Sequence, residues 1–135
     1  MNGSCLCGRI TIRVPGRPDY LNACNCTFCT KLGAVWGYFP LSRVEFAGEP
    51  RAYVRADIAD PALSGNFCPD CGATTHWAPH GPGRPDRAGI NMRLFDPAEL
   101  IGIELRFGDR RNHAGVEPRH HYREPTIFDG AGATA

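Results

Sequence analysis

Cys68-Pro69-Asp70-Cys71-Gly72 is one of three short segments that together contain all seven cysteines of this 135-residue chain. The other two are Cys5-Leu6-Cys7-Gly8 and Cys24-Asn25-Cys26-Thr27-Phe28-Cys29. A short turn with two cysteines and a following glycine presents two thiolates to one metal ion and leaves backbone N–H groups free to bond the sulfurs. Ordinary buried cysteines have no reason to cluster in this way. The pattern therefore predicts metal binding, with zinc as the metal that sulfur-only sites favour.

The number of cysteines allows two kinds of zinc site. A structural zinc is closed by four protein ligands, whereas a catalytic zinc keeps one position open beside three, and seven is four plus three. The spacing alone does not decide which segments combine. A single four-ligand ribbon is also possible, formed by Cys26, Cys29, Cys68 and Cys71. It would leave the other three cysteines without a role.

Two other uses of clustered cysteines rank below zinc binding. The spacings match neither of the common iron–sulfur patterns, in which successive cysteines follow the plant-type or the bacterial ferredoxin run. A Cys-x-x-Cys pair also supports thiol–disulfide chemistry, but such a pair usually lies beside a helix N-terminus. No helix is predicted after Cys29 or Cys71.

The composition is that of one small domain rich in turns. The chain has 16 glycines and 12 prolines, which favour short strands joined by turns over a helical bundle. Fifteen Lys and Arg residues against fourteen Asp and Glu residues give a net charge of +1. That charge is too small for a protein that binds nucleic acid through electrostatics alone, so we expect no nucleic-acid partner.

The first residues, Met1-Asn2-Gly3-Ser4, show neither the basic nor the apolar region of a secretory signal. No stretch approaches the roughly 18 apolar residues of a membrane span. We therefore expect a cytoplasmic protein with no membrane partner, in which the thiols stay reduced. The oligomeric state is left open.

Hydrophobic alternation predicts a mostly β fold of short antiparallel strands with little helix. Strands are expected over 8–14, 34–39, 89–94 and 102–107, and as a hairpin over 43–46 and 51–55. An Asp N-cap followed by proline predicts one helical turn over 96–100. Loops or irregular segments are expected over 79–87 and 108–126. We expect the chain to consist of one zinc domain over residues 1–128 and a disordered tail over 129–135.

The three cysteine segments resemble, in order and spacing, the glutathione-dependent formaldehyde-activating (GFA) family, also called the centromere-protein-V/GFA domain. The resemblance covers residues 3–107 and rests on Gly3 to Gly8, Cys24 to Gly33 and Phe67 to Gly72. Many members carry His between the first two cysteines of the middle triplet, where this chain has Asn25. The Asn version, together with the runs 74–77 and 91–94, resembles a sub-branch known only as aldehyde-activating.

The resemblance implies an Mss4-like, largely β fold with two zinc ions. It implies that the structural zinc is held by Cys5, Cys7, Cys68 and Cys71. It also implies that the catalytic zinc, with one open position, is held by Cys24, Cys26 and Cys29. This partition agrees with the four-plus-three arithmetic.

A zinc ion with three thiolate ligands suits a substrate thiol as its fourth ligand, because a bound thiol is deprotonated and becomes a nucleophile. Attack on an aldehyde then forms a carbon–sulfur bond reversibly. The family reaction joins glutathione and formaldehyde to S-(hydroxymethyl)glutathione. We therefore expect a carbon–sulfur lyase that uses a small thiol and an aldehyde. The alternative is a non-catalytic, zinc-stabilised binding module.

Glutathione carries two carboxylates, so basic residues should line its pocket. Lys31, just after the triplet, and Arg93 are the candidates, although each is also an ordinary choice for a solvated surface. His76 beside Trp77 is a candidate proton shuttle, but such a histidine more often packs against an aromatic neighbour. The cluster Arg119-His120-His121 is assigned to the surface.

Overall fold

The computed structural model describes residues 1–113 and 120–131 of the chain. Within them the fold is mostly β, with eleven strands and two short α-helices. This confirms the predicted fold class. The strands are β1 Asn2–Ser4, β2 Thr11–Arg13, β3 Leu21–Asn22, β4 Trp36–Phe39, β5 Glu45–Ala47, β6 Arg51–Val54, β7 Leu63–Phe67, β8 Thr74–Pro79, β9 Ala88–Asn91, β10 Glu104–Gly108 and β11 His121–Ile127. The helices are α1 Thr27–Leu32 and α2 Pro97–Leu100, with 3-10 turns η1 Leu41–Arg43 and η2 Met92–Leu94.

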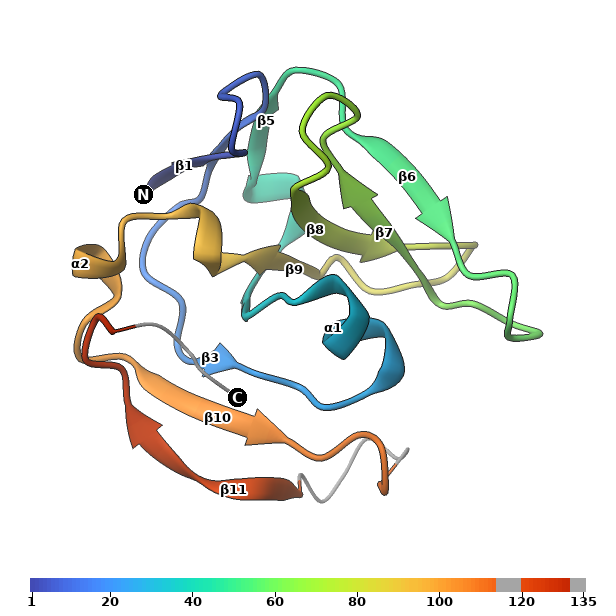
Figure 1. The fold of residues 1–135 in the computed structure, drawn as a ribbon. Helices are drawn as coiled ribbons and strands as arrows, with labels where there is room; N and C mark the ends of the chain where they lie inside the picture. Colours follow the sequence, from blue (N-terminus) through green and yellow to red (C-terminus); the bar gives the residue numbers. More distant parts are fainter. Residues whose placement is uncertain (114–119, 132–135) are drawn as a thin grey trace.

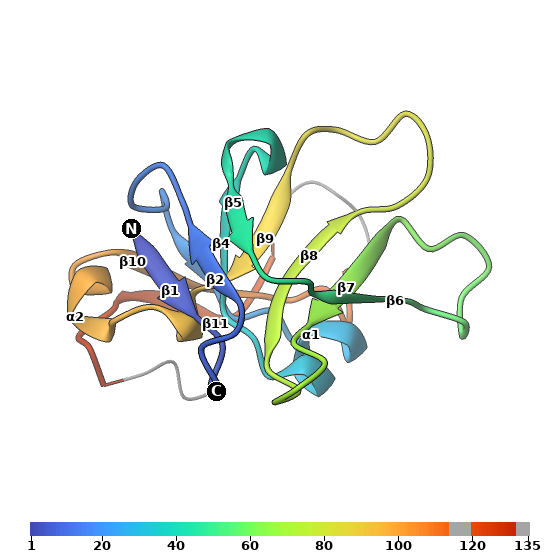
Figure 2. The same cartoon turned by 90° about the horizontal axis from the view of Figure 1, so that it is seen from above.

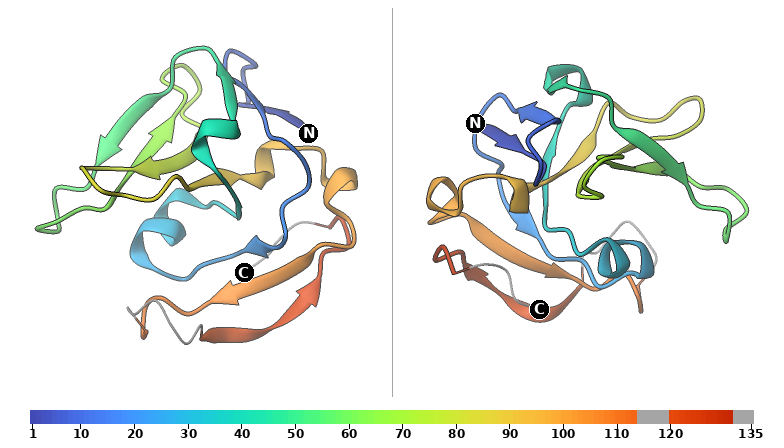
Figure 3. Two further views of the ribbon diagram at one scale, coloured as in Figure 1. Left: turned by 180° about the vertical axis from the view of Figure 1, so that it is seen from behind. Right: turned by 45° about the horizontal axis from the view of Figure 1, so that its top comes forward.

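The strands form two sheets. A three-stranded sheet has the order β1-β2-β5, and an eight-stranded sheet has the order β11-β10-β3-β4-β9-β8-β7-β6. Neighbouring strands run antiparallel except β3 and β10, which are parallel. The view from above shows β1 and β2 on one side of the molecule and β6, β7 and β8 on the other (Figure 2). Strands β10 and β11 lie at the far end of the larger sheet from β6 (Figure 3).

The apolar face of the first predicted strand is buried as its alternation requires. Ile10, Ile12 and Val14 are each at most 2% exposed, and they pack in the main core with residues of β9 and β10. The predicted strands at 34–39 and 102–107 are confirmed as β4 and β10. The predicted helical turn is confirmed as α2, where the Asp96 carboxylate accepts a hydrogen bond from the N–H of Ala98.

The predicted hairpin over 43–46 and 51–55 is wrong, because its two strands belong to different sheets. Strand β5 pairs with β2, where Arg13 forms an ion pair with Glu45. Strand β6 pairs with β7. The chain crosses between the sheets at Gly48, where a Cβ would lie 2.3 Å from the carbonyl oxygen of Arg9. A turn does separate β5 from β6, as the sequence predicts, but each of these strands pairs with a strand from another part of the chain.

Two further segments differ from the prediction. The strand expected over 89–94 ends at Asn91, because the Asn91 side chain accepts a hydrogen bond from the N–H of Arg93 and starts η2. The segment 108–126, expected to be irregular, contains β11 from His121 onward. This strand pairs only with β10 and is exposed along most of its length, so its sequence shows no apolar alternation. Residues 114–119, and residues 132–135 of the predicted tail, lie outside the described part.

His76 links the two sheets inside the core. Its ring lies 4.3 Å from that of Phe46, between centroids, so that β8 contacts β5. Its Nδ1 lies 2.9 Å from the hydroxyl of Thr75. The side chain is 6% exposed, and burial lowers the pKa of His76 from 6.5 to about 4. The imidazole is therefore neutral in the folded protein at pH 7.

Acidification is expected to weaken the fold through this residue. The unfolded chain takes up a proton on His76 below pH 6.5, and the folded chain does so only near pH 4. Stability is therefore lost as the pH falls between these values, by at most about 1.4 kcal/mol per pH unit. Urea unfolding of the His76→Gln variant should show a shallower pH dependence over this range than the wild type. His80→Gln, which changes an exposed histidine, is the matched control, and equal slopes for His76→Gln and wild type would contradict the assignment.

Candidate metal centre and cavity

Four cysteines from distant parts of the chain meet between the two sheets. Cys5 and Cys7 follow β1, and Cys68 and Cys71 lie in the turn between β7 and β8. Their four sulfurs all lie within 4.8 Å of one another. The Cys5–Cys7 and Cys7–Cys68 sulfur pairs are 3.6 and 3.7 Å apart. Ligands about 2.3 Å from a tetrahedral metal are separated by about 3.8 Å, so this group fits one metal ion such as zinc.

Both halves of the four-cysteine group are tight turns closed by glycine. The N–H of Gly8 donates to the carbonyl of Cys5, and that of Gly72 donates to the carbonyl of Cys68. Both glycines have a φ of 78°, a left-handed conformation that other residues rarely adopt. Hydrogen bonds from the backbone at Ala73 and Cys7 lower the pKa of the Cys71 thiol to about 6. The turns therefore favour the thiolate that binds metal.

The other three cysteines gather at the start of α1. Their sulfurs also lie within 4.8 Å of one another. Cys26 is the N-cap of α1, and its sulfur accepts a hydrogen bond from the N–H of Cys29. The indole N–H of Trp36 on β4 donates to the sulfur of Cys29 at 3.1 Å. The N–H of Cys26 donates to the sulfur of Cys24, so main-chain and side-chain donors contact all three sulfurs.

The expectation of no helix at the triplet is wrong, since α1 contains Cys29 and ends at Gly33 in the left-handed conformation. The helix has six residues, too few for an apolar period to show, and cysteine is not among the usual N-cap residues. A helix N-terminus stabilises thiolates, which serves metal binding as well as redox chemistry. The presence of α1 therefore makes a redox dithiol at the triplet compatible with the fold, but it equally suits a metal site.

Electrostatics at the triplet favour a bound cation. Hydrogen bonds from the Cys24 and Cys29 side chains lower the pKa of Cys26 to about 2. Hydrogen bonds with the Cys24 and Cys26 side chains raise the pKa of Cys29. Three negative sulfurs this close together therefore need a compensating positive charge, which a divalent metal provides. A ribbon that mixes Cys26 and Cys29 with the late pair is not formed, because these cysteines fall into separate groups.

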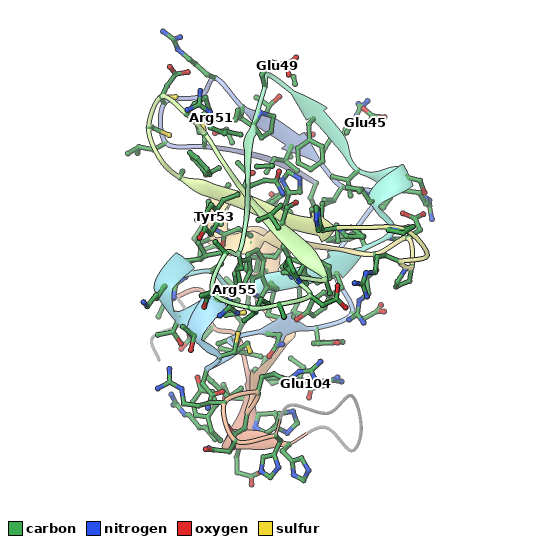
Figure 4. All side chains as sticks on the ribbon, turned by 90° about the vertical axis from the view of Figure 1, so that its right-hand side faces the viewer. Glu45, Glu49, Arg51, Tyr53, Arg55 and Glu104 are labelled. Carbon is green, nitrogen blue, oxygen red and sulfur yellow. The ribbon has the colours of Figure 1, made fainter. Side chains whose placement is uncertain are left out.

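The triplet lies in the wall of a cavity of about 640 Å³. Arg55, from the segment after β6, lies beside α1 at this cavity (Figure 4) and is paired with Asp57. An aromatic wall is formed by Tyr20, Trp36, Tyr38 and Trp77. Basic residues reach the cavity from several elements: Arg55, Arg87, Arg106, Arg110, His113, His120 and His121. A cavity of this size accommodates more than formaldehyde and a small thiol.

Asn25, the residue between the first two cysteines of the triplet, ties it to the end of β10. Its amide donates to the carboxylate of Asp109 at 2.7 Å, and its side-chain oxygen accepts from the N–H of Arg111. Hydrogen bonds from Asn25 and Asn112 hold the pKa of Asp109 below its ordinary value. Nε2 of His113 lies 3.8 Å from this carboxylate. The segment after β10 therefore places a carboxylate and an imidazole at the cavity.

The rings of His113 and His120 stack, with centroids 3.7 Å apart. The prediction that His120 and His121 lie at the surface is correct in that both are exposed, but both also line the cavity. Arg119 lies outside the described residues. No sequence signal marked this role, because the histidines lie more than eighty residues after the triplet and reach it only through the pairing of β10 with β3 and β11.

The candidate substrate contacts from the sequence lie elsewhere. Lys31 on α1 and Arg93 in η2 are both exposed, and neither lines the cavity. His76 is buried between the sheets against Phe46 and does not line the cavity either. The basic residues that do line it, such as Arg87, come from segments in which the sequence shows loop or strand signals but no functional motif.

The chain belongs to the glutathione-dependent formaldehyde-activating enzyme family, whose model matches residues 1–104. It is similar to a crystal structure of a Rhodobacter sphaeroides protein from a structural genomics programme, with 25% identity and a TM-score of 0.58. That match covers 71% of this chain and 88% of the other. No curated protein sequence matches the chain significantly. Among the described residues, no helix is both long and apolar enough to span a membrane.

The two cysteine groups should differ in what they do for the fold. Cys68→Ser breaks the group that joins the two sheets, and a structural zinc is worth an apparent ~10–16 kcal/mol against a domain stability of ~5–15 kcal/mol. This variant should be insoluble or unfolded. Cys26→Ser, at the cavity, should stay folded and bind one metal ion fewer. Circular dichroism and metal analysis test both, and the opposite order of tolerance would contradict the division.

Proposed function

We propose that this protein is a zinc-dependent carbon–sulfur lyase that reversibly adds a thiol to an aldehyde. The observation that carries the proposal is the three-cysteine group in the wall of a large cavity, separate from a closed four-cysteine group. A scaffold protein needs the closed group alone. The family to which the chain belongs supports the same reaction class.

Two zinc ions per chain follow from the two groups. Cys5, Cys7, Cys68 and Cys71 would hold the first, and Cys24, Cys26 and Cys29 the second. A zinc ion at the triplet would supply an open coordination position at which a thiol binds as its thiolate. Because all these ligands must be reduced, the proposal also favours a reducing compartment such as the cytoplasm.

The chain's own residues would orient the reactants and move the proton. The Trp36 indole fixes the sulfur of Cys29, and Arg55 places a positive charge near the thiolates. The aromatic wall would offer the reactants an apolar surface beside the triplet. When the substrate sulfur attacks the aldehyde carbon, a carbon–sulfur bond forms and the carbonyl π pair becomes an alkoxide. The thiol proton would pass to His113, oriented by Asp109, and from there to the alkoxide oxygen.

Elemental analysis of protein purified without chelator should give two zinc ions per chain. Iodoacetamide should then leave the triplet unmodified under native conditions, because a metal-bound thiolate has a reduced tendency to react. Removal of the more weakly held ion should expose three thiols to alkylation while the fold persists. One zinc per chain together with immediate alkylation of the triplet would contradict the two-site proposal.

The reaction is tested by NMR exchange between an aldehyde and its hemithioacetal across a panel of thiols. The zinc-loaded protein should accelerate exchange for at least one thiol among glutathione, cysteine and 2-mercaptoethanol. The His113→Gln variant should be slower by about a hundredfold, the usual contribution of a positioned acid or base. Cys26→Ser should show no acceleration. Asn25 sets this chain apart from many relatives, so the whole panel, rather than glutathione alone, decides the outcome.

Cobalt substitution gives an independent readout of thiol binding. The ligand-field spectrum of the cobalt-loaded protein should change when the accepted thiol is added, and Cys26→Ser should show no such change. Protein that holds two zinc ions but neither accelerates the reaction nor changes its spectrum with any thiol would favour the non-catalytic binding module.

A further inference from the structure

Arg87 is a half-buried cation in the cavity wall, and no acidic residue of the described part of the chain pairs with it. Its guanidinium lies 4.2 Å from the centroid of the Tyr38 ring, and one nitrogen donates to the hydroxyl of Tyr20 at 3.3 Å. Within the described residues, no carboxylate lies within ion-pair distance of it. The preceding residue, Asp86, binds Ser42 instead. A fixed and uncompensated guanidinium of this kind is a binding group for an anion.

A second guanidinium reinforces the positive field at the same place. Arg106 lies 3.9 Å from the centroid of the Tyr20 ring, so Arg87 and Arg106 contact the hydroxyl and the face of one tyrosine. Arg106 is paired with Glu104 at 3.0 Å. Arg106 therefore has a paired carboxylate, whereas Arg87 has none at ion-pair distance, and an anion from a ligand would bind at Arg87.

The position of the acids decides from which side an anion approaches. A second hollow of about 390 Å³ shares Tyr20, Tyr38 and Arg87 with the main cavity and also contains Asp19 and Asp86. These carboxylates repel an anion on that side. An anionic group therefore reaches Arg87 from the main cavity, which also contains the cysteine triplet.

Strand β4 sets the distance between the two ends of the ligand. Trp36 and Tyr38 are two residues apart and both line the cavity, so they lie on one face of the strand about 7 Å apart. Trp36 contacts the sulfur of Cys29, and Tyr38 supports Arg87. Between the triplet and the cation, a ligand therefore meets aromatic rings, including Trp77, whose ring centroid is 6.0 Å from that of Tyr38.

We propose that the substrate of this protein is a flat aromatic or conjugated carboxylate, whose carboxylate binds Arg87 while its thiol or aldehyde group lies at the cysteine triplet. The reactive end rests on the function proposed above, whereas the binding of the carboxylate does not depend on it. The flat body stacks on the wall of Tyr38 and Trp77, where aromatic pairs are favourable. This ligand class differs from a flexible peptide thiol, which offers no planar surface to that wall.

Cinnamate and cinnamamide test the anion site without any reaction, because they share a flat body and differ in charge. Isothermal titration of the zinc-loaded protein should show cinnamate at least about tenfold tighter than cinnamamide, as a charge-assisted pair contributes. Arg87→Gln should weaken cinnamate by about ten- to hundredfold and leave cinnamamide unchanged. Arg87→Lys, which keeps the charge but loses the planar fork, should fall between the two.

Arg51→Gln is the matched control, because Arg51 lies on β6 outside the cavity, with Tyr53 between it and Arg55 (Figure 4). It should bind cinnamate as the wild type does. Butyrate, a carboxylate without a ring, should bind at least tenfold more weakly than cinnamate, since it leaves the aromatic wall uncovered. Equal binding of cinnamate and cinnamamide, equal binding of butyrate and cinnamate, or wild-type cinnamate binding by Arg87→Gln would overturn the proposal.

Two reactive probes distinguish which partner carries the carboxylate. With the cobalt-loaded protein, 4-mercaptobenzoate should change the ligand-field spectrum if the thiol is the aromatic acid. If the aldehyde is the aromatic acid, the exchange between 4-formylbenzoate and its hemithioacetal should instead be slower in Arg87→Gln than in the wild type. Binding of cinnamate by a protein that catalyses no thiol addition would support the anion site and sink the proposed reaction. Catalysis without cinnamate binding would do the reverse.

Discussion

The contact between sulfurs that lie 61 residues apart in the chain is the constraint on which the rest of the structure depends. Cys5 and Cys7 follow β1 of the three-stranded sheet, and Cys68 and Cys71 lie between β7 and β8 of the eight-stranded sheet. A metal ion bound at this point would fix the two sheets to each other, whose strands are mostly three to six residues long. The buried contact of His76 with Phe46 joins the same two sheets. The four-cysteine group and the His76–Phe46 contact therefore add to the shared core around Ile10 and Ile12 in holding the two sheets together.

The second cysteine group shows how local and distant structure combine to build a candidate metal site. A six-residue helix supplies the N-terminus at Cys26, and β4 supplies the indole that bonds Cys29. The end of β10 reaches Asn25 through Asp109 and brings histidines to the same cavity. Each contact comes from a different region of the chain, so the chemistry of the triplet is set by strand pairing as much as by cysteine spacing.

Charge distribution matters more here than net charge. The whole chain carries a formal charge of +1, yet four arginines line one cavity against two aspartates. Of these aspartates, Asp109 accepts hydrogen bonds from Asn25 and Asn112, and Asp60 pairs with Arg84. Arg55 and Arg106 are paired with Asp57 and Glu104, so Arg87 is the cavity arginine at which we propose that an anionic ligand binds. The net charge of +1 argues against a protein that binds nucleic acid through electrostatics alone, but it does not describe the charges inside this cavity.

The sequence by itself determined the metal-binding turns and the local strand and helix signals, because both depend only on residues close together in the chain. Cysteine and glycine spacing predicted the metal-binding turns, because the geometry of a turn is fixed within four or five residues. The alternation of Ile10, Ile12 and Val14 predicted a buried strand face, and Asp96 with Pro97 predicted α2. The grouping of the cysteines into four and three came from the family resemblance rather than from spacing.

Only the tertiary structure decided which strands pair and which side chains reach the cavity. The segments around Gly48 carry the signals of a hairpin, but β5 and β6 find better partners in β2 and β7. Arg87 and His113 look like ordinary surface residues in the sequence, whereas Lys31 and Arg93, which look better placed, lie away from the cavity. The physical reason is that the cavity wall is assembled from strands far apart in the chain. Which of these strands pair depends on side-chain contacts between distant segments, and no local pattern encodes those contacts.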